Sequence, residues 1–300
     1  MIEFKNVTKK IESNIILDGV DLSIPNGAVF GLLGSNGAGK STILRLLSGI
    51  YSNDSGEILI DGSKVFDCPE TKQKVFFVND ETMQFSRFTL EELKTYYKNY
   101  YKNFSEEIFD KLRNKVKLPG GKKLSTFSKG MKRQAIVITG LACQTDFLLL
   151  DEAFDGLDPT MRIIVKNMIF DAVMDRKLTV VISSHNLKEI NEICDTAGLL
   201  HNGRIIFCRD IDSVKGSIHK IQAVFRSPVS EEDFTGLDIM HFERTQSVYR
   251  IIIRGDADET EKKLNSMEPV VLDMLPLSLE EIFIYEMEVL GYNAEDIDNK

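Results

Sequence analysis

The stretch Gly34-Ser35-Asn36-Gly37-Ala38-Gly39-Lys40-Ser41 decides the fold class of this chain. It matches the pattern GxxxxGK followed by Ser or Thr, and it lies between the apolar run 29–33 and the helical pattern 41–47, which is the context that the pattern requires. The glycines let the backbone curl, so that successive N–H groups and the helix N-terminus point at phosphate oxygens. Lys40 adds a positive charge, and Ser41 offers a hydroxyl to Mg²⁺. The stretch predicts a phosphate-binding loop; the alternative is a glycine turn that only ends a strand.

Two carboxylates, Asp151 and Glu152, follow the apolar run 147–150. A short, continuously apolar run is expected of a parallel strand that is covered on both faces. A strand that emerges beside the phosphate loop would bring Asp151 to the metal, usually through water, and Glu152 next to the γ-phosphate. Taken alone, such a pair is more often a solvated strand end. Together with the phosphate loop, it indicates a catalytic pair.

Three further features are ordinary when each is taken alone. Ser128 precedes the apolar-periodic segment 132–142 and fits the N-cap of a helix. The stretch Asp155-Gly156-Leu157-Asp158-Pro159 has the composition of a turn. The strand pattern 179–182 runs into Ser183-Ser184-His185, and a single His after a strand is more often structural than catalytic.

In this order along the chain, these residues resemble the nucleotide-binding subunit of an ATP-binding cassette (ABC) transporter, over about residues 1–210. The resemblance implies an ATPase that uses ATP and Mg²⁺, with 34–42 as the Walker A loop and 147–152 as Walker B. It implies that Glu152 is the catalytic carboxylate, that His185 is the switch histidine and that Lys40 belongs to the catalytic set. The residues implied to bind ATP are Gly34, Ser35, Asn36, Gly37, Ala38, Gly39, Lys40, Ser41, Thr42 and Ile11.

The segment 127–131 resembles the signature of this family, and 155–158 resembles its D-loop, to which Asp158 belongs. In the family two such domains pair head to tail, so that the signature of one caps the ATP on the Walker A loop of the other. The resemblance therefore implies a homodimer or a heterodimer with a second ABC ATPase. The signature residues that would act on the partner's ATP are Ser128, Lys129, Gly130 and Met131.

Three positions depart from the family pattern. The signature reads FSKGM in place of LSGGQ, which keeps Ser128 and Gly130. Asn79 stands where a Gln usually follows the strand after the Walker A helix, and its amide oxygen sits on a side chain that is one methylene shorter. Ile11, an aliphatic residue, stands near the position of the aromatic ring that stacks on adenine. The implied metal ligands are Ser41, Asp151 and Asn79.

The hydrophobic pattern predicts an α/β fold with two domains. Alternating and apolar runs near the N-terminus are typical of strands in a β-rich lobe, and the runs 147–150 and 179–182 are typical of buried parallel strands. With the resemblance, this pattern predicts a P-loop NTPase of the ABC ATPase fold over residues 1–215, with a RecA-like core and a helical subdomain at about 80–145. Further strand and helix patterns predict a small C-terminal α/β accessory domain over 216–300.

The composition fits a folded, soluble protein and excludes several classes of partner. The chain has 300 residues, of which 43% are hydrophobic and 28% charged, close to globular averages. Its net charge of -9 argues against binding nucleic acid through charge. The cysteines are scattered, as in proteins with reduced thiols. No stretch approaches about 18 uncharged apolar residues, so we expect a cytoplasmic protein that is peripheral at the inner face of the cell membrane through a membrane partner.

The helical pattern over 88–104 bears on that partner. Its aromatic residues share one apolar face, and core packing explains most of this arrangement. In the ABC family, however, this region adjoins the groove that receives a cytoplasmic helix of the membrane subunit. The residues concerned are Tyr96, Tyr97, Tyr100, Tyr101 and Phe104.

We therefore expect an ATPase subunit that dimerises around two Mg-ATP molecules and powers a separate membrane-embedded transporter subunit. The signature variant and the tail 277–283 resemble exporters of the bacitracin-resistance and antimicrobial-peptide type, which implies export of peptides or antimicrobial compounds. The alternative is a soluble, ATP-switched binding protein that is not coupled to transport. A third hypothesis, a weakly hydrolysing member of a heterodimer, is disfavoured by the presence of Glu152 and His185.

Overall fold

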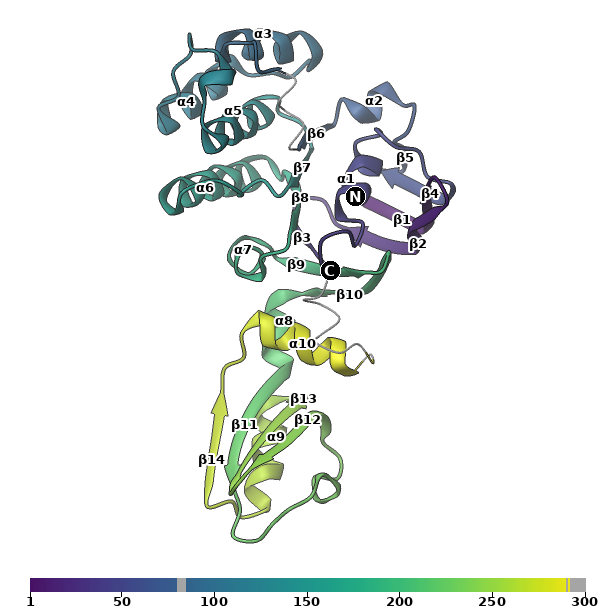
Figure 1. The fold of residues 1–300 in the computed structure, drawn as a ribbon, viewed down its shortest axis with the longest axis vertical. Coiled ribbons are helices and arrows are strands. Elements are labelled where there is room, and N and C mark those ends of the chain that lie inside the picture. The colour runs from purple at the N-terminus through teal and green to yellow at the C-terminus, as the bar shows by residue number, and fades with distance from the viewer. Residues whose placement is uncertain (80–84, 290, 292–300) are drawn as a thin grey trace. The chain divides into compact units, whose positions relative to one another are not determined.

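The computed structural model describes residues 1–79, 85–289 and 291 (Figure 1). The chain divides into two units, Met1–Cys208 and Arg209–Lys300, and each is described by itself.

Some of the residues covered by the predictions lie outside the described part of the chain. These are 80–84, at the start of the predicted helical subdomain, and 290 and 292–300, near the end of the predicted C-terminal domain. The predicted domain limits, 1–215 and 216–300, stay predictions.

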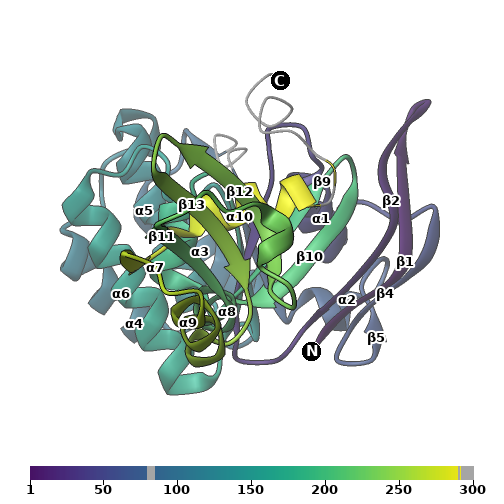
Figure 2. The same cartoon turned by 90° about the horizontal axis from the view of Figure 1, so that it is seen from below.

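An antiparallel sheet opens the first unit, and its strand order is β2-β1-β4-β5. Figure 2 shows β1, β2 and β4 side by side. Apolar side chains alternate with polar ones along β1, where Ile2, Phe4 and Val7 are buried, as expected of a strand with one face in the core. This sheet is the predicted β-rich lobe. Its strands are β1 (Ile2–Ile11), β2 (Asn14–Ile24), β4 (Ser55–Ile60) and β5 (Ser63–Lys64).

A six-stranded sheet forms the centre of the first unit, in the order β10-β9-β3-β8-β7-β6. The register of β3 with β8 and β9, of β8 with β7 and of β7 with β6 is parallel in each case. All five residues of β3 and all six of β8 are buried, which explains the apolar runs 29–33 and 180–182. The strands are β3 (Val29–Leu33), β6 (Val75–Val78), β7 (Phe147–Asp151), β8 (Thr179–Ser184), β9 (Thr196–His201) and β10 (Arg204–Asp210).

The helices of the first unit fall into two groups. Helix α1 contacts β7, and α7 contacts β3 and β8, so both pack on the central sheet. Helices α3, α4 and α5 contact one another and form the predicted helical subdomain, in which α5 also contacts β6 and α6. The helices are α1 (Lys40–Leu47), α2 (Pro69–Lys72), α3 (Leu90–Tyr100), α4 (Glu106–Val116), α5 (Lys129–Ala142), α6 (Pro159–Arg176) and α7 (Leu187–Ile193), with a 3-10 turn at Leu124–Thr126.

The second unit is a four-stranded antiparallel sheet with helices on both faces. Ile251 and Ile253 of β13 pack in one apolar cluster with Leu264 of α9, whereas Ile252, between them, packs with Ile282 of α10 on the other face. The strand order is β12-β13-β11-β14. The elements are α8 (Ile211–Ser217), β11 (Ile218–Val224), a 3-10 turn at Glu231–Asp233, β12 (Asp238–Thr245), β13 (Val248–Arg254), α9 (Ala257–Ser266), β14 (Val271–Leu275) and α10 (Leu279–Val289).

Candidate functional site

The glycine-rich loop connects the buried strand β3 to helix α1. Gly39 is the N-cap of α1 and has a φ of 109°, a left-handed conformation that glycine adopts without steric cost. A Cβ there would lie 2.9 Å from Leu17 and 3.2 Å from the Ile16 carbonyl oxygen. Because glycine has no side-chain oxygen to cap the helix, the first N–H groups of α1 suit an anionic ligand.

The Lys40 side chain folds back over this loop. Its Nζ donates hydrogen bonds to the carbonyl oxygens of Gly34, at 2.6 Å, and Ser35, at 3.0 Å. The residue is buried. Burial lowers the pKa of the Lys40 ammonium, and the charges of Glu152 and Asp151 oppose this shift. Those electrostatic interactions place the ammonium and the two carboxylates in one site.

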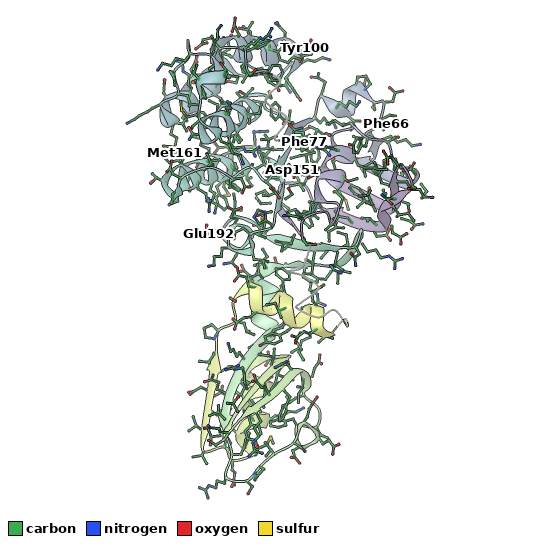
Figure 3. The ribbon with its side chains drawn as sticks, viewed as in Figure 1. Phe66, Phe77, Tyr100, Asp151, Met161 and Glu192 are labelled. Carbon is green, nitrogen blue, oxygen red and sulfur yellow. The ribbon has the colours of Figure 1, made fainter. Side chains whose placement is uncertain are left out.

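Asp151 and Glu152 are held by a serine of the neighbouring strand. Ser183 Oγ donates to Asp151 Oδ1 at 2.5 Å. The Glu152 N–H donates to the carbonyl oxygen and to the hydroxyl of Ser183, both at 3.2 Å. Strand β8 lies between β3 and β7, so Ser183 sits between the glycine-rich loop and the carboxylates. Asp151 is labelled at the end of β7 in Figure 3.

His185 follows β8 directly and faces the second carboxylate. Its Nδ1 lies 3.4 Å from Glu152 Oε1. Glu152 has a φ of 46°, which is unusual for a residue other than glycine. The structure therefore brings four residues from three strand ends to the same edge of the sheet: Lys40, Asp151, Glu152 and His185.

The predicted signature begins helix α5, next to the turn 155–158. Ser128 is the N-cap, and its hydroxyl accepts a hydrogen bond from the Met131 N–H at 3.2 Å. A Cβ on Gly130 would lie 2.6 Å from the Gly156 carbonyl oxygen, so the two loops are in close contact. Lys129 lies alongside Gly156. Ser128 thus has the structural role of an N-cap in the described chain.

Asp158, in the turn 155–158, also caps a helix. Its Oδ1 accepts a hydrogen bond from the Met161 N–H at 3.0 Å, at the start of α6.

Asn79 and Ile11 lie on other elements. Asn79 directly follows β6, the edge strand next to β7. Ile11 is the last residue of β1, in the antiparallel sheet, and 39% of it is exposed. An exposed apolar side chain at a strand end is free to contact a ligand.

An open groove of about 400 Å³ runs from Asn79 to helix α3. Tyr97 and Tyr101 line it and contact Phe76 in tilted arrangements, with ring centroids 5.2 and 5.6 Å away. Burial raises the pKa of both phenols, and the Tyr101 hydroxyl donates to the Val75 carbonyl oxygen at 3.0 Å. Core packing therefore accounts for these two rings, whereas Tyr100 (Figure 3) is 58% exposed.

The role of Ser183 was not predicted from the sequence, and the groove beside 88–104 was expected only from the family resemblance. A serine at the end of an apolar strand was a visible signal for Ser183, but its two partners are more than 30 residues away. The groove had no local signal, because its walls come from α1, β6 and α3 and from the segments that follow them.

A sequence-family model described as ABC transporter matches residues 17–155. The ABC transporter ATP-binding protein YtrB of Bacillus subtilis is 32% identical to this chain, over 95% of this chain and 97% of YtrB. The linearmycin resistance ATP-binding protein LnrL of the same organism is 30% identical, over 69% of this chain and 68% of LnrL. A methionine import ATP-binding protein, MetN of Staphylococcus saprophyticus, is 29% identical over 90% of this chain and 82% of MetN.

Solved structures show the same fold. The structure of the ATP-binding subunit of an ABC transporter superposes with a TM-score of 0.66 and 25% identity, over 72% of this chain and 92% of that one. The dimeric post-hydrolysis structure of the cassette MJ0796 has a TM-score of 0.63 and 23% identity, over 70% of this chain and 99% of that one. Among the described residues of this chain, no helix is long and apolar enough to cross a membrane.

Proposed function

This chain belongs to the ABC transporter family as an ATP-binding, ATP-hydrolysing subunit, and we propose that it works as a Mg²⁺-dependent, head-to-tail dimer that powers export through a separate membrane subunit. The observation that carries the proposal is the convergence of Lys40, Asp151, Glu152 and His185 at one edge of the parallel sheet. A phosphate group on the glycine-rich loop would lie within reach of each of these side chains.

The residues at this edge fit a magnesium ion. A hydroxyl, a carboxylate and an amide oxygen are hard donors of the kind that Mg²⁺ prefers. Ser41, Asp151 and Asn79 would hold the ion, and Ser183 already orients the Asp151 carboxylate. When bound, the ion would neutralise charge on the phosphates.

The chain's own residues have distinct proposed roles in hydrolysis. The Lys40 ammonium, now bonded to loop carbonyls, would turn to the γ-phosphate and offset its charge. Glu152 would accept a hydrogen bond from the attacking water and orient it for in-line attack. His185 Nδ1 is 3.4 Å from Glu152 Oε1, and its imidazole would contact the γ-phosphate when ATP is bound.

The dimer would complete the site from a second chain. Ser128, Lys129, Gly130 and Met131 form the N-cap and first turn of α5, where Ser128 and Lys129 are exposed and Gly130 is buried, and we propose that they cap ATP in the partner. The close contact of Gly130 with Gly156 ties the signature to the D-loop of the same chain. A displacement of Asp158 on dimerisation would therefore also displace the signature residues.

The groove beside α3 favours coupling to a membrane protein over the soluble, ATP-switched alternative. It is lined by aromatic rings and by Ile50, which is 52% exposed. A short apolar helix from a membrane subunit is the partner that fits such a surface. The relative named for linearmycin resistance favours export of peptides or antimicrobial compounds, whereas the relative named for methionine import shows that import occurs in the family.

The test is recruitment to membranes by the membrane protein encoded next to this gene. Co-expression should move the chain to the membrane fraction and stimulate its ATPase activity. Ile50→Glu should abolish both effects while the basal ATPase activity stays within about two-fold, because an exposed rim position carries little folding energy. Ile163→Glu on α6, at a position 60% exposed, is the matched control and should behave like wild type. A chain that stays soluble beside every neighbouring membrane protein would support the soluble alternative.

A further inference from the structure

Two adjacent serines at the end of β8 form hydrogen bonds with different partners. Side chains alternate along a strand, so Ser183 and Ser184 point to opposite faces of the sheet. Ser183 binds the carboxylate pair, as described above. Ser184 Oγ donates to Glu189 Oε2 at 2.9 Å and accepts from the Asn186 N–H at 2.9 Å. The Ser184 hydroxyl thus fixes the chain on both sides of His185.

Glu189 is a buried carboxylate on the first turns of α7. Only 5% of the residue is exposed, and a buried carboxylate is stable only when both oxygens find partners. One oxygen accepts from Ser184 Oγ. The other, Oε1, lies 3.3 Å from Nη1 of Arg162.

Arg162 connects this carboxylate to the D-loop. It lies in the first turns of α6, and its backbone N–H donates to the Asp158 carbonyl oxygen at 2.9 Å. Asp158 is the N-cap of that helix. A continuous set of polar contacts therefore runs from Asp158 through Arg162, Glu189 and Ser184 to the turn that carries His185.

A simpler explanation is that Glu189 only fastens α7 to α6. A second ion pair, between Lys166 and Glu192, already joins the same two helices. The Lys166 ammonium also lies 5.5 Å from the centre of the Phe154 ring. Glu192, labelled in Figure 3, is in the same helix as Glu189. What distinguishes Glu189 is its hydrogen bond to Ser184, which points to a role at the His185 turn.

We propose that Glu189 is a positioning residue for His185: through Ser184 it holds the imidazole beside Glu152, and through Arg162 it links that position to the D-loop. This inference rests on the proposed function, in which His185 acts at the γ-phosphate. The contact of His185 with Glu152 is long, at 3.4 Å, so it cannot hold the ring by itself. The buried Glu189 supplies the rigidity that the exposed imidazole lacks.

The first test compares two acids on α7. Glu189→Ala should lower kcat for ATP about 10- to 100-fold, because a displacement of about 1 Å at a catalytic group can cost 10²-fold. KM for ATP should stay within about three-fold, since the glycine-rich loop that binds the phosphates is untouched. Glu192→Ala removes the other α6–α7 ion pair and should keep kcat within about two-fold, because pairs with an exposed partner contribute little. Equal losses of kcat in both variants would show that Glu189 only joins α7 to α6, and would overturn the proposal.

The second test separates positioning from folding. In a His185→Ala background, Glu189→Ala should cause no further loss of kcat, because residues that act as a unit are not additive. A further 10-fold loss in that background would contradict the proposal. Should Glu189→Ala fail to fold, Glu189→Gln and Ser184→Ala decide the question. The amide of Glu189→Gln keeps an acceptor for Ser184 and should retain most of the activity, whereas Ser184→Ala should reproduce the loss.

The controls also separate this inference from the proposed function. If His185→Ala hydrolyses ATP at the wild-type rate, the proposed role of His185 is wrong. If His185→Ala is impaired and Glu189→Ala is not, the role of His185 stands and the positioning role of Glu189 is rejected.

Discussion

The central sheet of the first unit and the sheet of the second unit are both packed with helices, yet only one gathers reactive side chains at a strand edge. In the central sheet, β3, β8 and β7 are parallel neighbours, so their carboxyl ends meet at one edge. Lys40, Asp151 and His185 reach that edge from positions far apart in the sequence. The sheet of the second unit is antiparallel, and its strand ends alternate between two edges.

The setting of charged side chains differs between the two regions in the same way. Glu286 of α10 is 6% exposed and lies 2.9 Å from the guanidinium of Arg254 on β13. That pair fastens a helix to a sheet in the second unit. Glu152, by contrast, is paired only at 3.4 Å and stays accessible to a ligand. We infer that the accessible charge of Glu152 at the edge of the central sheet serves chemistry, whereas the buried pair of Glu286 with Arg254 serves packing.

The largest effect is expected from Glu152→Gln, which tests whether the carboxylate at the edge of the central sheet serves catalysis. Loss of a general base costs about 10² to 10⁴ in rate, while the phosphate-binding loop is unchanged. The variant should therefore bind Mg-ATP, hydrolyse it very slowly and elute as a dimer in size-exclusion chromatography. Without nucleotide, or with EDTA, the same variant should elute as a monomer. Turnover at the wild-type rate would reject Glu152 as the catalytic carboxylate.

An intermediate effect is expected from Glu286→Gln, which tests whether the buried charge of the second unit serves stability alone. Removing the charge leaves Arg254 without its close partner, at a cost of about 1 to 3 kcal/mol of unfolding free energy. ATPase activity should not change. The control is Arg250→Gln, which breaks the exposed pair with Glu243 and should cost less than about 1 kcal/mol. Denaturant unfolding followed by circular dichroism measures both; a loss of ATPase activity in Glu286→Gln would break the comparison.

The smallest effect is expected in the antiparallel sheet of the first unit, at Ile11. Stacking of a base on an aromatic ring contributes about 1 to 3 kcal/mol, and an aliphatic side chain recovers only part of that. Ile11→Tyr should tighten ATP binding by roughly 1 kcal/mol, or about five-fold. The wild type should hydrolyse ATP and GTP at rates within about a factor of ten. Calorimetry that finds tight, adenine-selective binding in the wild type would show that another residue stacks on the base.

Local sequence predicted the elements that carry this site. The continuous apolar runs identified β3, β7 and β8, and the glycine-rich loop identified the start of α1. The parallel arrangement then predicted that the ends of these strands meet. The ABC ATPase fold, with its β-rich lobe and helical subdomain, was predicted from the resemblance of the ordered motifs to the ABC family, together with these patterns, and is confirmed.

Sequence reasoning did not find the side chains that hold the site in place. The role of Ser183 depends on which strand lies beside which, and the order of strands is decided by contacts between segments over 100 residues apart, such as β3 with β8. The contact of Glu189 with Arg162 depends on the packing of α7 against α6. A serine, a glutamate and an arginine have no periodic pattern that reveals such contacts. The catalytic, metal-binding and ATP-binding roles predicted for the site residues all stay predictions, those of the signature residues, Asn79 and Ile11 included.

The left-handed backbone at Glu152 has a consequence for how this protein would respond to selection for thermal stability. A residue other than glycine in that region costs about 1 to 3 kcal/mol, and Glu152 has a φ of 46°. Glycine at this position would relieve the strain, and we expect the resulting chain to be more stable but to lack the carboxylate that we propose for catalysis. A screen that rewards heat resistance alone would therefore enrich inactive variants at this position, because the site retains its carboxylate against the preference of its own backbone.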